Sequence, residues 1–370
     1  MSAPAETGVD KLLAELPLPT PICKMAPLRF DCYVGIAGFE ARCVSATQEL
    51  AVRGSKSAAT VCVQYNDAEM AKANETHLRD LTQHLQCLAG GKPTSPLMHD
   101  NHRLQEEFGE RLRTAIISTG VDLGNKDAHV GFDITVGSSR LLLEGLHALL
   151  NTNVNLTLVY SEASEYRPLF SEHLKYIQER RSAGALPPEF LTLGVDQVDV
   201  LRRIPGRNAD ARPTYLVAFP SFSCTRMEAV LEELSPSRVH WIFGIPHLVR
   251  NRWRIDAQKE YHASLMERAH RRCYVSTFDY RETLAALNGI FLKRRSQYSI
   301  LIASLGSKLQ KVGQVLFHLL RPEVGAVVSI PRKWEPDRFS SDKPREIYAL
   351  QLGSCPNIRH QLIAAKSLKM

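Results

Sequence analysis

The stretch VGIAGFEAR at residues 34–42 recurs in altered form as LVAFPSFSCTR at residues 216–226. Each copy ends an apolar, β-rich run, turns through polar residues and begins an apolar-periodic segment with helical spacing. A second block behaves in the same way, because FDITVGSSR at residues 132–140 is matched by IASLGSK at residues 302–308. Two unrelated blocks that repeat in one order indicate that a whole α/β unit has been duplicated.

Strand and helix patterns alternate along both copies. This alternation predicts an α/β fold of two tandem Rossmann-like units, each a mainly parallel sheet flanked by helices, with helical inserts. In the first unit we expect strands at 30–37, 59–65, 129–135 and 154–160, helices at 41–52 and 139–150, and insert helices at 67–88 and 100–118. In the second unit we expect strands at 214–219, 239–245, 273–276 and 324–330, and a largely helical insert at about 247–297.

The ends of the two copies suggest where the domains meet. A further strand is expected in each unit, at 190–193 before Gly194 and at 347–352 before Gly353. The segment between them that is rich in Arg, Asp, Asn and Pro lacks an apolar period, which is typical of a linker. The expected organisation is an N-terminal arm at 1–28, a first unit at 29–203, a linker at 204–213 and a second unit at 214–370.

Composition narrows the class of protein. The chain has 370 residues, enough for two domains, and its hydrophobic fraction of 44% and charged fraction of 23% are those of a globular protein. We see no apolar run long enough to span a membrane and no signal-peptide pattern. The eight cysteines are scattered without a CxxC pair, which predicts reduced thiols in a cytoplasmic protein and no zinc site. Nothing in the sequence calls for a metal or another cofactor, and we expect no membrane partner.

The net charge of +7 is concentrated in basic runs of the second half. Each run alone is explained by a solvated basic face. Several together favour an anionic partner, which could be a nucleotide, a nucleic acid or an acidic protein. The runs lie at 202–203, 250–254, 271–272 and 293–295.

The turns after the repeated strands carry the candidate binding residues. In a parallel α/β sheet, the carboxyl ends of the strands and the N-termini of the following helices form the ligand crevice. Ser138, Ser139 and Ser307 offer hydroxyl groups there, and Arg140 and Lys308 could add positive charge beside a phosphate. The alternative is that the serines only cap their helices.

Two further pairs of residues recur at matching places. We expect Arg42 and Arg226 to point from the first helical turn toward an acid or a ligand. Tyr166 and Trp334 follow corresponding strands, where a flat ring could stack on a base. A ring at a loop edge can equally serve as hydrophobic cover.

Three acids, Glu40, Asp133 and Glu162, fall at or near strand ends of the first unit, where general acids and bases could converge. They raise the alternative of a nucleotide-processing hydrolase, although the helix dipole alone would favour Glu40 in a first helical turn. The second unit has hydroxyls and basic residues at the corresponding places. A non-catalytic scaffold is the third reading, because no Walker, Ser-His-Asp or zinc motif is present.

Residues 133–140 resemble a known signature. Asp133 and Thr135 followed by Arg140 are similar to the motif of CARF domains, the Rossmann-like sensors of cyclic oligonucleotides, although Arg140 lies one residue later than in that motif. In the second unit Ser304 and Lys308 have the family spacing, but Ile302 stands where an acid or amide belongs. Two such units in one chain resemble the SAVED architecture of bacterial antiphage systems.

The resemblance implies a sensing module for a nucleotide or cyclic oligonucleotide, with the ligand held between the two units and a separate protein effector subunit. It implies two sets of ligand contacts, Thr135, Ser138, Ser139 and Arg140 in the first unit and Ser304, Ser307 and Lys308 in the second.

Overall fold

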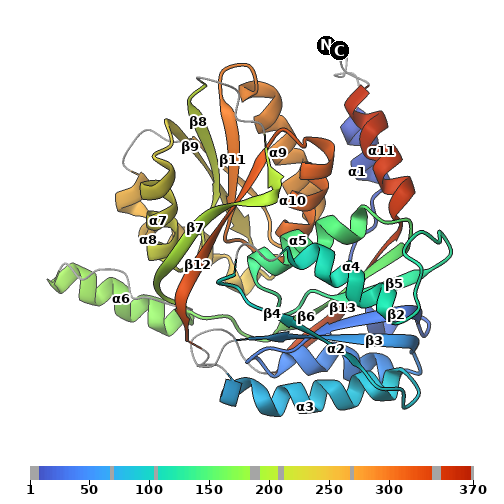
Figure 1. Ribbon diagram of the computed structural model, residues 1–370. Coiled ribbons are helices and arrows are strands. Elements are labelled where there is room, and N and C mark those ends of the chain that lie inside the picture. The colour runs from blue at the N-terminus through green and yellow to red at the C-terminus, as the bar shows by residue number, and fades with distance from the viewer. Residues whose placement is uncertain are drawn as a thin grey trace. The chain divides into compact units, whose positions relative to one another are not determined.

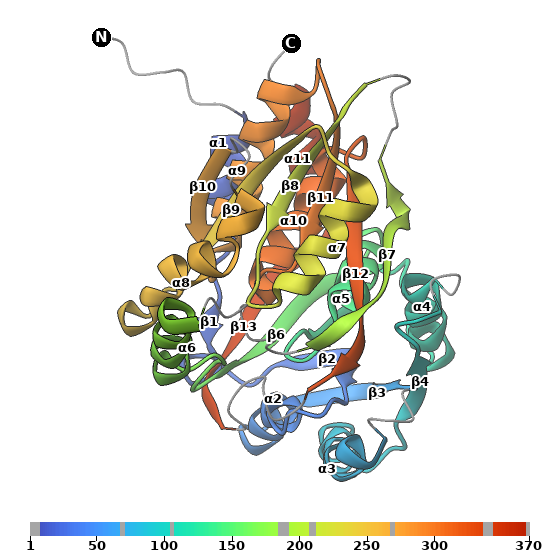
Figure 2. The same cartoon turned by 90° about the vertical axis from the view of Figure 1, so that its left-hand side faces the viewer.

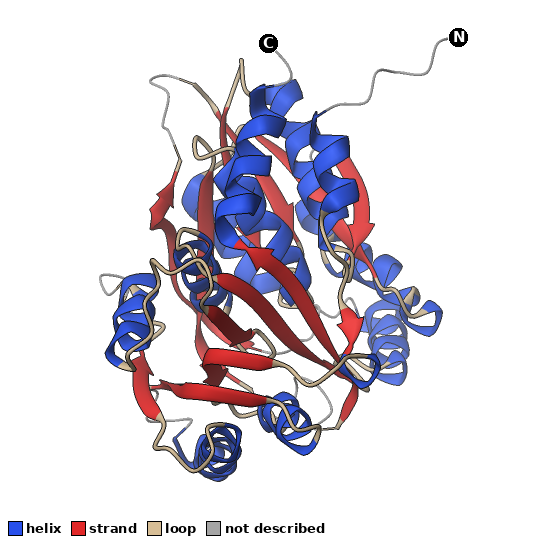
Figure 3. Cartoon of the chain, turned by 90° about the vertical axis from the view of Figure 1, so that its right-hand side faces the viewer, coloured by secondary structure: helices blue, strands red, loops and turns tan. Residues whose placement is uncertain are grey.

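The structure is a computed structural model that describes residues 8–66, 71–103, 107–183, 192–206, 212–266, 271–335 and 343–367 (Figure 1). The chain divides into two compact units. The first comprises Met1–Ser164 and Ser341–Met370, and the second comprises Glu165–Ser340. Each unit contains a sheet of mostly parallel strands flanked by helices, which confirms the predicted α/β fold with two Rossmann-like units (Figure 3).

The sheet of the first unit has the order β1-β13-β6-β5-β2-β3-β4. The five strands β6, β5, β2, β3 and β4 run parallel to one another. Strand β13 pairs with β6 antiparallel, and β1 pairs with β13 antiparallel. The strands are β1 (Thr20–Pro21), β2 (Arg29–Ile36), β3 (Lys56–Tyr65), β4 (Ser95–His99), β5 (His129–Asp133), β6 (Asn155–Ala163) and β13 (Pro344–Ser354).

The sheet of the second unit has the order β10-β9-β8-β11-β12-β7. The strands from β10 to β12 are parallel, and β7 pairs with β12 antiparallel. The strands are β7 (Thr192–Pro205), β8 (Thr214–Phe219), β9 (Arg238–Ile245), β10 (Arg271–Ser276), β11 (Ser299–Ser304) and β12 (Gly325–Trp334).

The five parallel strands of the two sheets share one topology. Counted along the chain within each unit, they lie in the order 3-2-1-4-5, which is that of the first five strands of the doubly wound Rossmann fold, and an antiparallel strand lies beside the fifth. The turning point of this order lies between β2 and β5 in the first unit and between β8 and β11 in the second. We call this place the switch point, because the chain connections leave it in opposite directions.

The antiparallel strands β7 and β13 differ from our expectation. We expected β7 in the first unit and β13 in the second, but each belongs to the sheet of the other unit. Strand β7 extends into the start of the expected linker at 204–213 and pairs with β12, and strand β13 near the C-terminus returns to pair with β6. The expected boundary therefore falls inside the second unit, and residues 207–211 of that linker lie outside the described residues. A strand's apolar pattern does not specify which sheet edge it will cover, so the sequence could not assign these two strands.

Helices cover both faces of each sheet (Figure 1). In the first unit α2 and α3 lie over one face and α4 and α5 over the other; in the second, α7 and α8 lie opposite α9 and α10. The helices of the first unit are α1 (Gly8–Glu15), α2 (Arg42–Val52), α3 (Ala71–Leu88), α4 (Phe108–Ser118), α5 (Ser139–Leu150) and α11 (Cys355–Ser367). Those of the second are α6 (Phe170–Ala183), α7 (Cys224–Leu234), α8 (Trp253–Tyr261), α9 (Tyr280–Arg294) and α10 (Lys308–Leu320).

The insert and arm differ in detail from the prediction. The expected helix at 100–118 begins at Phe108, and the short strand β4 that precedes it was missed. In the N-terminal arm, α1 packs against α11 and β1 extends the sheet, so the arm forms part of the first unit. The described residues also form short 3-10 helices, η1 (Ile22–Lys24), η2 (Val249–Asn251) and η3 (Ala263–Met266).

Helix α6 lies beside α8 in the second unit (Figure 2). The rings of Tyr176 and Tyr261 stack with centroids 4.6 Å apart, and Phe222 meets Tyr261 edge-on at 5.5 Å. Arg254, from one of the basic runs, is directed inward and donates to the carbonyl oxygens of the segment before α6, including that of Tyr166 at 3.1 Å. This basic side chain therefore has a structural partner and is not part of a solvated face.

The eight cysteines are all unpaired; half of them are buried and the others are partly or fully exposed. No helix in the described part of the chain is both long and apolar enough to cross a membrane.

Candidate functional site

The two switch points are built alike around an arginine in the first turn of a helix. Arg42 of α2 donates from Nη1 to the carbonyl oxygen of Ser161 on β6 at 2.8 Å. Arg226 of α7 donates from Nη2 to the carbonyl oxygen of Ser329, which is on the equivalent strand β12. Both arginines are buried, so the sequence correctly paired them but did not foresee that each is anchored to a neighbouring strand.

The first switch point neutralises its arginine with its own carboxylate. Glu40 accepts from Nε and Nη2 of Arg42 at 3.0 and 3.2 Å, which is the planar two-bond geometry that guanidinium groups form with carboxylates. In the second unit, Cys224 stands two residues before Arg226, and its thiol donates to the carbonyl oxygen of Tyr261 at 3.3 Å. The carboxylate that compensates the first arginine therefore has no counterpart at this place in the second unit.

Arg226 is consequently a buried cation without a carboxylate partner among the described residues. It is 9% exposed, and its Nε atom has no hydrogen-bond partner there. The ring of Trp334 lies 5.9 Å from its guanidinium carbon, and burial lowers the pKa of Arg226 to about 10. Leaving a buried guanidinium nitrogen unpaired is costly, so this arrangement fits a group that binds an anion.

A second cation at this switch point was missed by the sequence analysis. Lys311, in the first turn of α10, is 3% exposed and donates from Nζ to the carbonyl oxygen of Gly306 at 2.6 Å. Burial lowers the pKa of Lys311 well below its usual value, and the positive charges of Lys308 and Arg226 lower it further. The sequence signal was a lysine in an otherwise apolar helix face, one turn after the Gly306-Ser307 turn.

The serines of the second unit have divided roles. Ser307 caps α10, because its hydroxyl accepts from the backbone N–H of Gln310 at 3.1 Å while Gln310 accepts from the backbone N–H of Ser307. The hydroxyls of Ser304 and Ser329 are buried and have no hydrogen-bond partner among the described residues. Ser304 is the last residue of β11, and Ser329 lies within β12.

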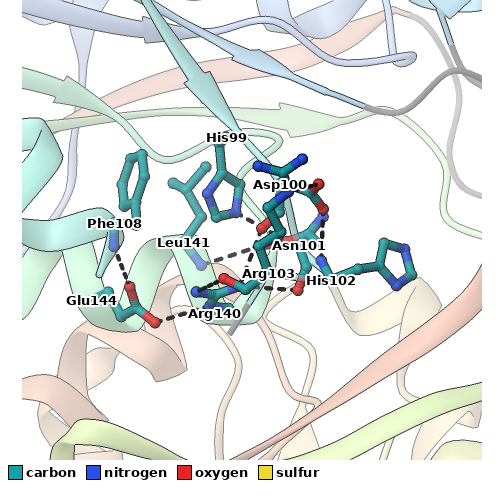
Figure 4. Close-up of polar contacts among 10 residues, drawn as sticks. His99, Asp100, Asn101, His102, Arg103, Phe108, Arg140, Leu141 and Glu144 are labelled. Atoms are coloured by element: carbon teal, nitrogen blue, oxygen red, sulfur yellow. Dashed lines mark hydrogen bonds and ion pairs between the residues drawn. The ribbon is translucent and has the colours of Figure 1, made fainter. Parts of the chain in front are cut away.

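The matching turn of the first unit holds a loop in place (Figure 4). Arg140 donates to the Oε1 atom of Glu144 at 3.0 Å and to the backbone carbonyl oxygens of Asp100, Asn101 and Arg103 at 2.8–3.1 Å. Glu144 also accepts from the backbone N–H of Phe108 at the start of α4. The Arg140 side chain thus ties α5 to the segment between β4 and α4.

Ser138 and its neighbours belong to the same structural network. The Ser138 hydroxyl caps α5 by accepting from the backbone N–H of Leu141 and donates to the side chain of Asn101 at 2.8 Å. Asn101 also contacts His99, whose pKa burial lowers to about 3, so this ring is neutral at physiological pH. Ser139 is the half-buried first residue of α5.

The three candidate acids lie in different surroundings. Glu40 pairs with Arg42 as described, and Glu162 of β6 pairs with Arg345 of β13 at 2.8 Å. Asp133 is 2% exposed; its Oδ1 atom accepts from the backbone N–H of Thr135, and its Oδ2 atom has no partner among the described residues. Burial raises the pKa of Asp133 to about 6. The hydroxyl of Thr135 accepts from the backbone N–H of Ser161 at 3.0 Å.

The sheet registers refine how the two copies correspond. Asp133 lies beside Val159 in the first sheet, and Ala303 lies beside Val327 in the second. Val159 and Val327 each lie two residues before the serine that accepts from the anchoring arginine. The structural counterpart of Asp133 is therefore Ala303, one residue beyond the Ile302 suggested by the sequence.

The two candidate stacking rings both fall in the second unit. Trp334 ends β12 beside Arg226, whereas Tyr166 lies in the segment before α6, at the start of the second unit. The switch point of the second unit thus brings together Arg226, Ser304, Ser307, Lys308, Lys311, Ser329 and Trp334.

Comparisons with known proteins add little to this geometry. No protein-family model matches the chain, and no curated protein matches it. Among solved structures, it is similar to a crystal structure of the cytoplasmic domain of a prokaryotic cation chloride cotransporter, with 7% identity over 82% of this chain and 96% of that chain. The TM-score of 0.25 is too low to support an argument about fold or function.

Proposed function

We propose that the second unit binds the phosphate of a nucleotide or cyclic oligonucleotide at its switch point. In this proposal the protein is a sensing module of a prokaryotic defence system, and it signals to a separate effector chain. The observation that carries the binding site is the burial of two basic side chains, Arg226 and Lys311, without a carboxylate partner in the described part of the chain. The resemblance of residues 133–140 to the CARF signature supports the sensing role.

The physical argument rests on the cost of buried charge. An uncompensated cation in a protein interior destabilises the fold, and replacement by apolar residues is often neutral or stabilising. Such residues are expected where function requires them, because an anion that enters the site supplies the missing charge. The site also lies where ligands bind in open α/β sheets, outside the carboxyl ends of the strands at the switch point.

The first unit indicates how an anion would meet Arg226. There, the Glu40 carboxylate forms two hydrogen bonds with the guanidinium of Arg42. A phosphate has the same planar arrangement of acceptor oxygens toward a guanidinium group. In the second unit it would take the place of the missing carboxylate, with Ser304 and Ser329 available as hydroxyl donors.

A thermal-shift screen with mononucleotides, cyclic dinucleotides and cyclic oligoadenylates tests the proposal. A ligand present at 100 times its dissociation constant should raise the melting temperature of the second unit by roughly 5–10 °C. Arg226→Gln should abolish the shift because it removes the guanidinium charge. Lys293→Ala is the matched control, since Lys293 is an exposed cation at the opposite end of α9 from the site. If no nucleotide shifts the transition, or if Arg226→Gln binds like the parent, the proposal is wrong.

The unpartnered Oδ2 atom of Asp133 favours one second candidate function, a nucleotide hydrolase with Asp133 as general base. Because burial raises the pKa of this carboxyl to about 6, turnover should rise as the pH increases through 6 and then level off. Asp133→Asn should eliminate hydrolysis while nucleotide binding persists. Liquid chromatography of nucleotides incubated with the parent protein or with Asp133→Asn measures the hydrolysis. Equal amounts of product from the two proteins would show that Asp133 is not the general base.

A further inference from the structure

The charge at the second switch point constrains the kind of phosphate that fits it. We call Arg226, Lys308 and Lys311 the basic cluster. Arg226 is bonded to the carbonyl oxygen of Ser329 and Lys311 to that of Gly306, and neither meets a carboxylate in the described residues. Carbonyl oxygens satisfy hydrogen bonds but supply no negative charge, so nothing balances the Arg226 guanidinium or the Lys311 amine when that amine is protonated.

The surroundings of Lys311 make its charge sensitive to what occupies the site. The charged groups that act on its amine are Lys308, on the same helix, and Arg226, on α7 across the switch point, and both are positive. Burial and this repulsion together lower the pKa of Lys311 well below its usual value. An anion close to the amine acts in the opposite direction, since it favours the protonated form.

The number of negative charges on the ligand then decides how well the basic cluster is compensated. A phosphodiester, as in a cyclic oligonucleotide, carries one negative charge per phosphate and can balance Arg226 alone. A terminal phosphate carries close to two charges at neutral pH and has three oxygens that can accept hydrogen bonds. It can therefore balance Arg226 and Lys311 together and also accept from the hydroxyls of Ser304 and Ser329, which have no partner among the described residues.

We infer that the basic cluster selects a terminal phosphate or diphosphate, as found at the end of a linear nucleotide, and that Lys311 takes up a proton when this group binds. The inference rests on the proposed function, because it specifies the ligand of the same site. It assigns Lys311 as the residue that distinguishes a doubly charged phosphate from a phosphodiester.

Isothermal titration calorimetry of the full chain at pH 7 tests both parts. The probes are inorganic pyrophosphate, AMP and ADP, compared with 3′,5′-cyclic AMP and cyclic di-AMP. The terminal phosphates should bind at least about tenfold more tightly than the phosphodiesters, since one additional balanced charge is expected to exceed 1.4 kcal/mol. Measured in two buffers of different ionisation enthalpy, their binding enthalpies should differ in the direction of proton uptake, and affinity should fall as the pH is raised.

Lys311→Met supplies the decisive comparison. This variant should lose the preference for terminal phosphates and the dependence of the enthalpy on the buffer, whereas Lys293→Ala should retain both. Unchanged tryptophan emission will establish that the second unit of each variant is folded, because all three tryptophans belong to that unit. Tight binding of cyclic di-AMP without binding of ADP or pyrophosphate would overturn this inference and leave the proposed function intact. Binding of neither class would overturn both, and binding of ADP without proton uptake would refute the role of Lys311.

Discussion

Deletion of Pro344–Met370 is expected to unfold the first unit and to leave the second unit folded. The deleted segment contains β13, which lies between β1 and β6 in the first sheet, and α11, which packs on α1. Four large apolar side chains leave the core with it, Leu350, Leu352, Ile358 and Leu362. At about 1.5–3 kcal/mol for each side chain, this loss is comparable to the whole stability of a domain, about 5–15 kcal/mol.

Polar contacts would be lost in the same deletion. Glu162, which is 4% exposed, would lose its ion pair with Arg345. Arg359 would no longer donate to the carbonyl oxygens of Leu150 and Thr152 at the end of α5. The long edge of β6 would become unpaired, so the truncated chain should also aggregate at high concentration.

The distribution of tryptophan allows the two units to be followed separately. The chain has three tryptophans, Trp241, Trp253 and Trp334, and all belong to the second unit. The truncated protein should lose far-ultraviolet circular dichroism while it retains the native emission of the buried Trp241. A chain that ends at Ser367 is the control, because it keeps every described residue. A red-shifted tryptophan emission after truncation would show instead that the C-terminal segment supports the second unit, as the sequence alone suggested.

Local patterns in the sequence were sufficient to place most of the parallel strands and their helices. The predicted helix at 139–150 and strand at 214–219 have the observed limits, because a polar turn precedes each helix and the apolar runs are uninterrupted. The missed strand β4 is short and contains Pro96 at its second position, so it lacked a strand signal. The exchange of β7 and β13 was beyond prediction, since pairing across such a distance along the chain leaves no periodic signature.

The candidate site was predictable in its position but not in the use of each side chain. The repeated turns correctly marked the carboxyl ends of the strands. Whether an arginine at one of these turns binds a ligand or other protein groups depends on residues that lie far away along the chain. The partners of Arg140 include three backbone carbonyl oxygens from a loop about forty residues earlier in the chain, and backbone carbonyls carry no sequence signal. Lys311 was missed for a related reason, because helical spacing placed it on a face that otherwise reads as core.

The contacts of Arg140 lead to the second prediction, that Arg140→Ala destabilises the first unit by about 3–5 kcal/mol. The substitution leaves the Glu144 carboxylate buried without its cation and removes the donors of three loop carbonyls. Burial already raises the pKa of Glu144, and the positive charge of Arg140 opposes that rise. Loss of Arg140 should therefore raise the pKa of Glu144 further. The stability that the variant loses relative to the parent should be largest at neutral and higher pH, where the buried carboxylate is ionised without its cation or must take up a proton.

Urea unfolding followed by circular dichroism measures the effect, with tryptophan emission as an internal reference for the second unit. Arg113→Ala is the matched control, because Arg113 forms a partly exposed pair with Glu110 at 3.5 Å and should cost less than about 1 kcal/mol. A double variant with Glu144→Gln should lose less stability than the sum of the single variants, since it removes the unpaired charge together with the cation. If Arg140→Ala instead unfolds like the parent and abolishes nucleotide binding, the arginine acts on a ligand as the CARF resemblance implies. The stability of this one variant thus distinguishes a residue that holds the loop between β4 and α4 from a residue that holds a phosphate.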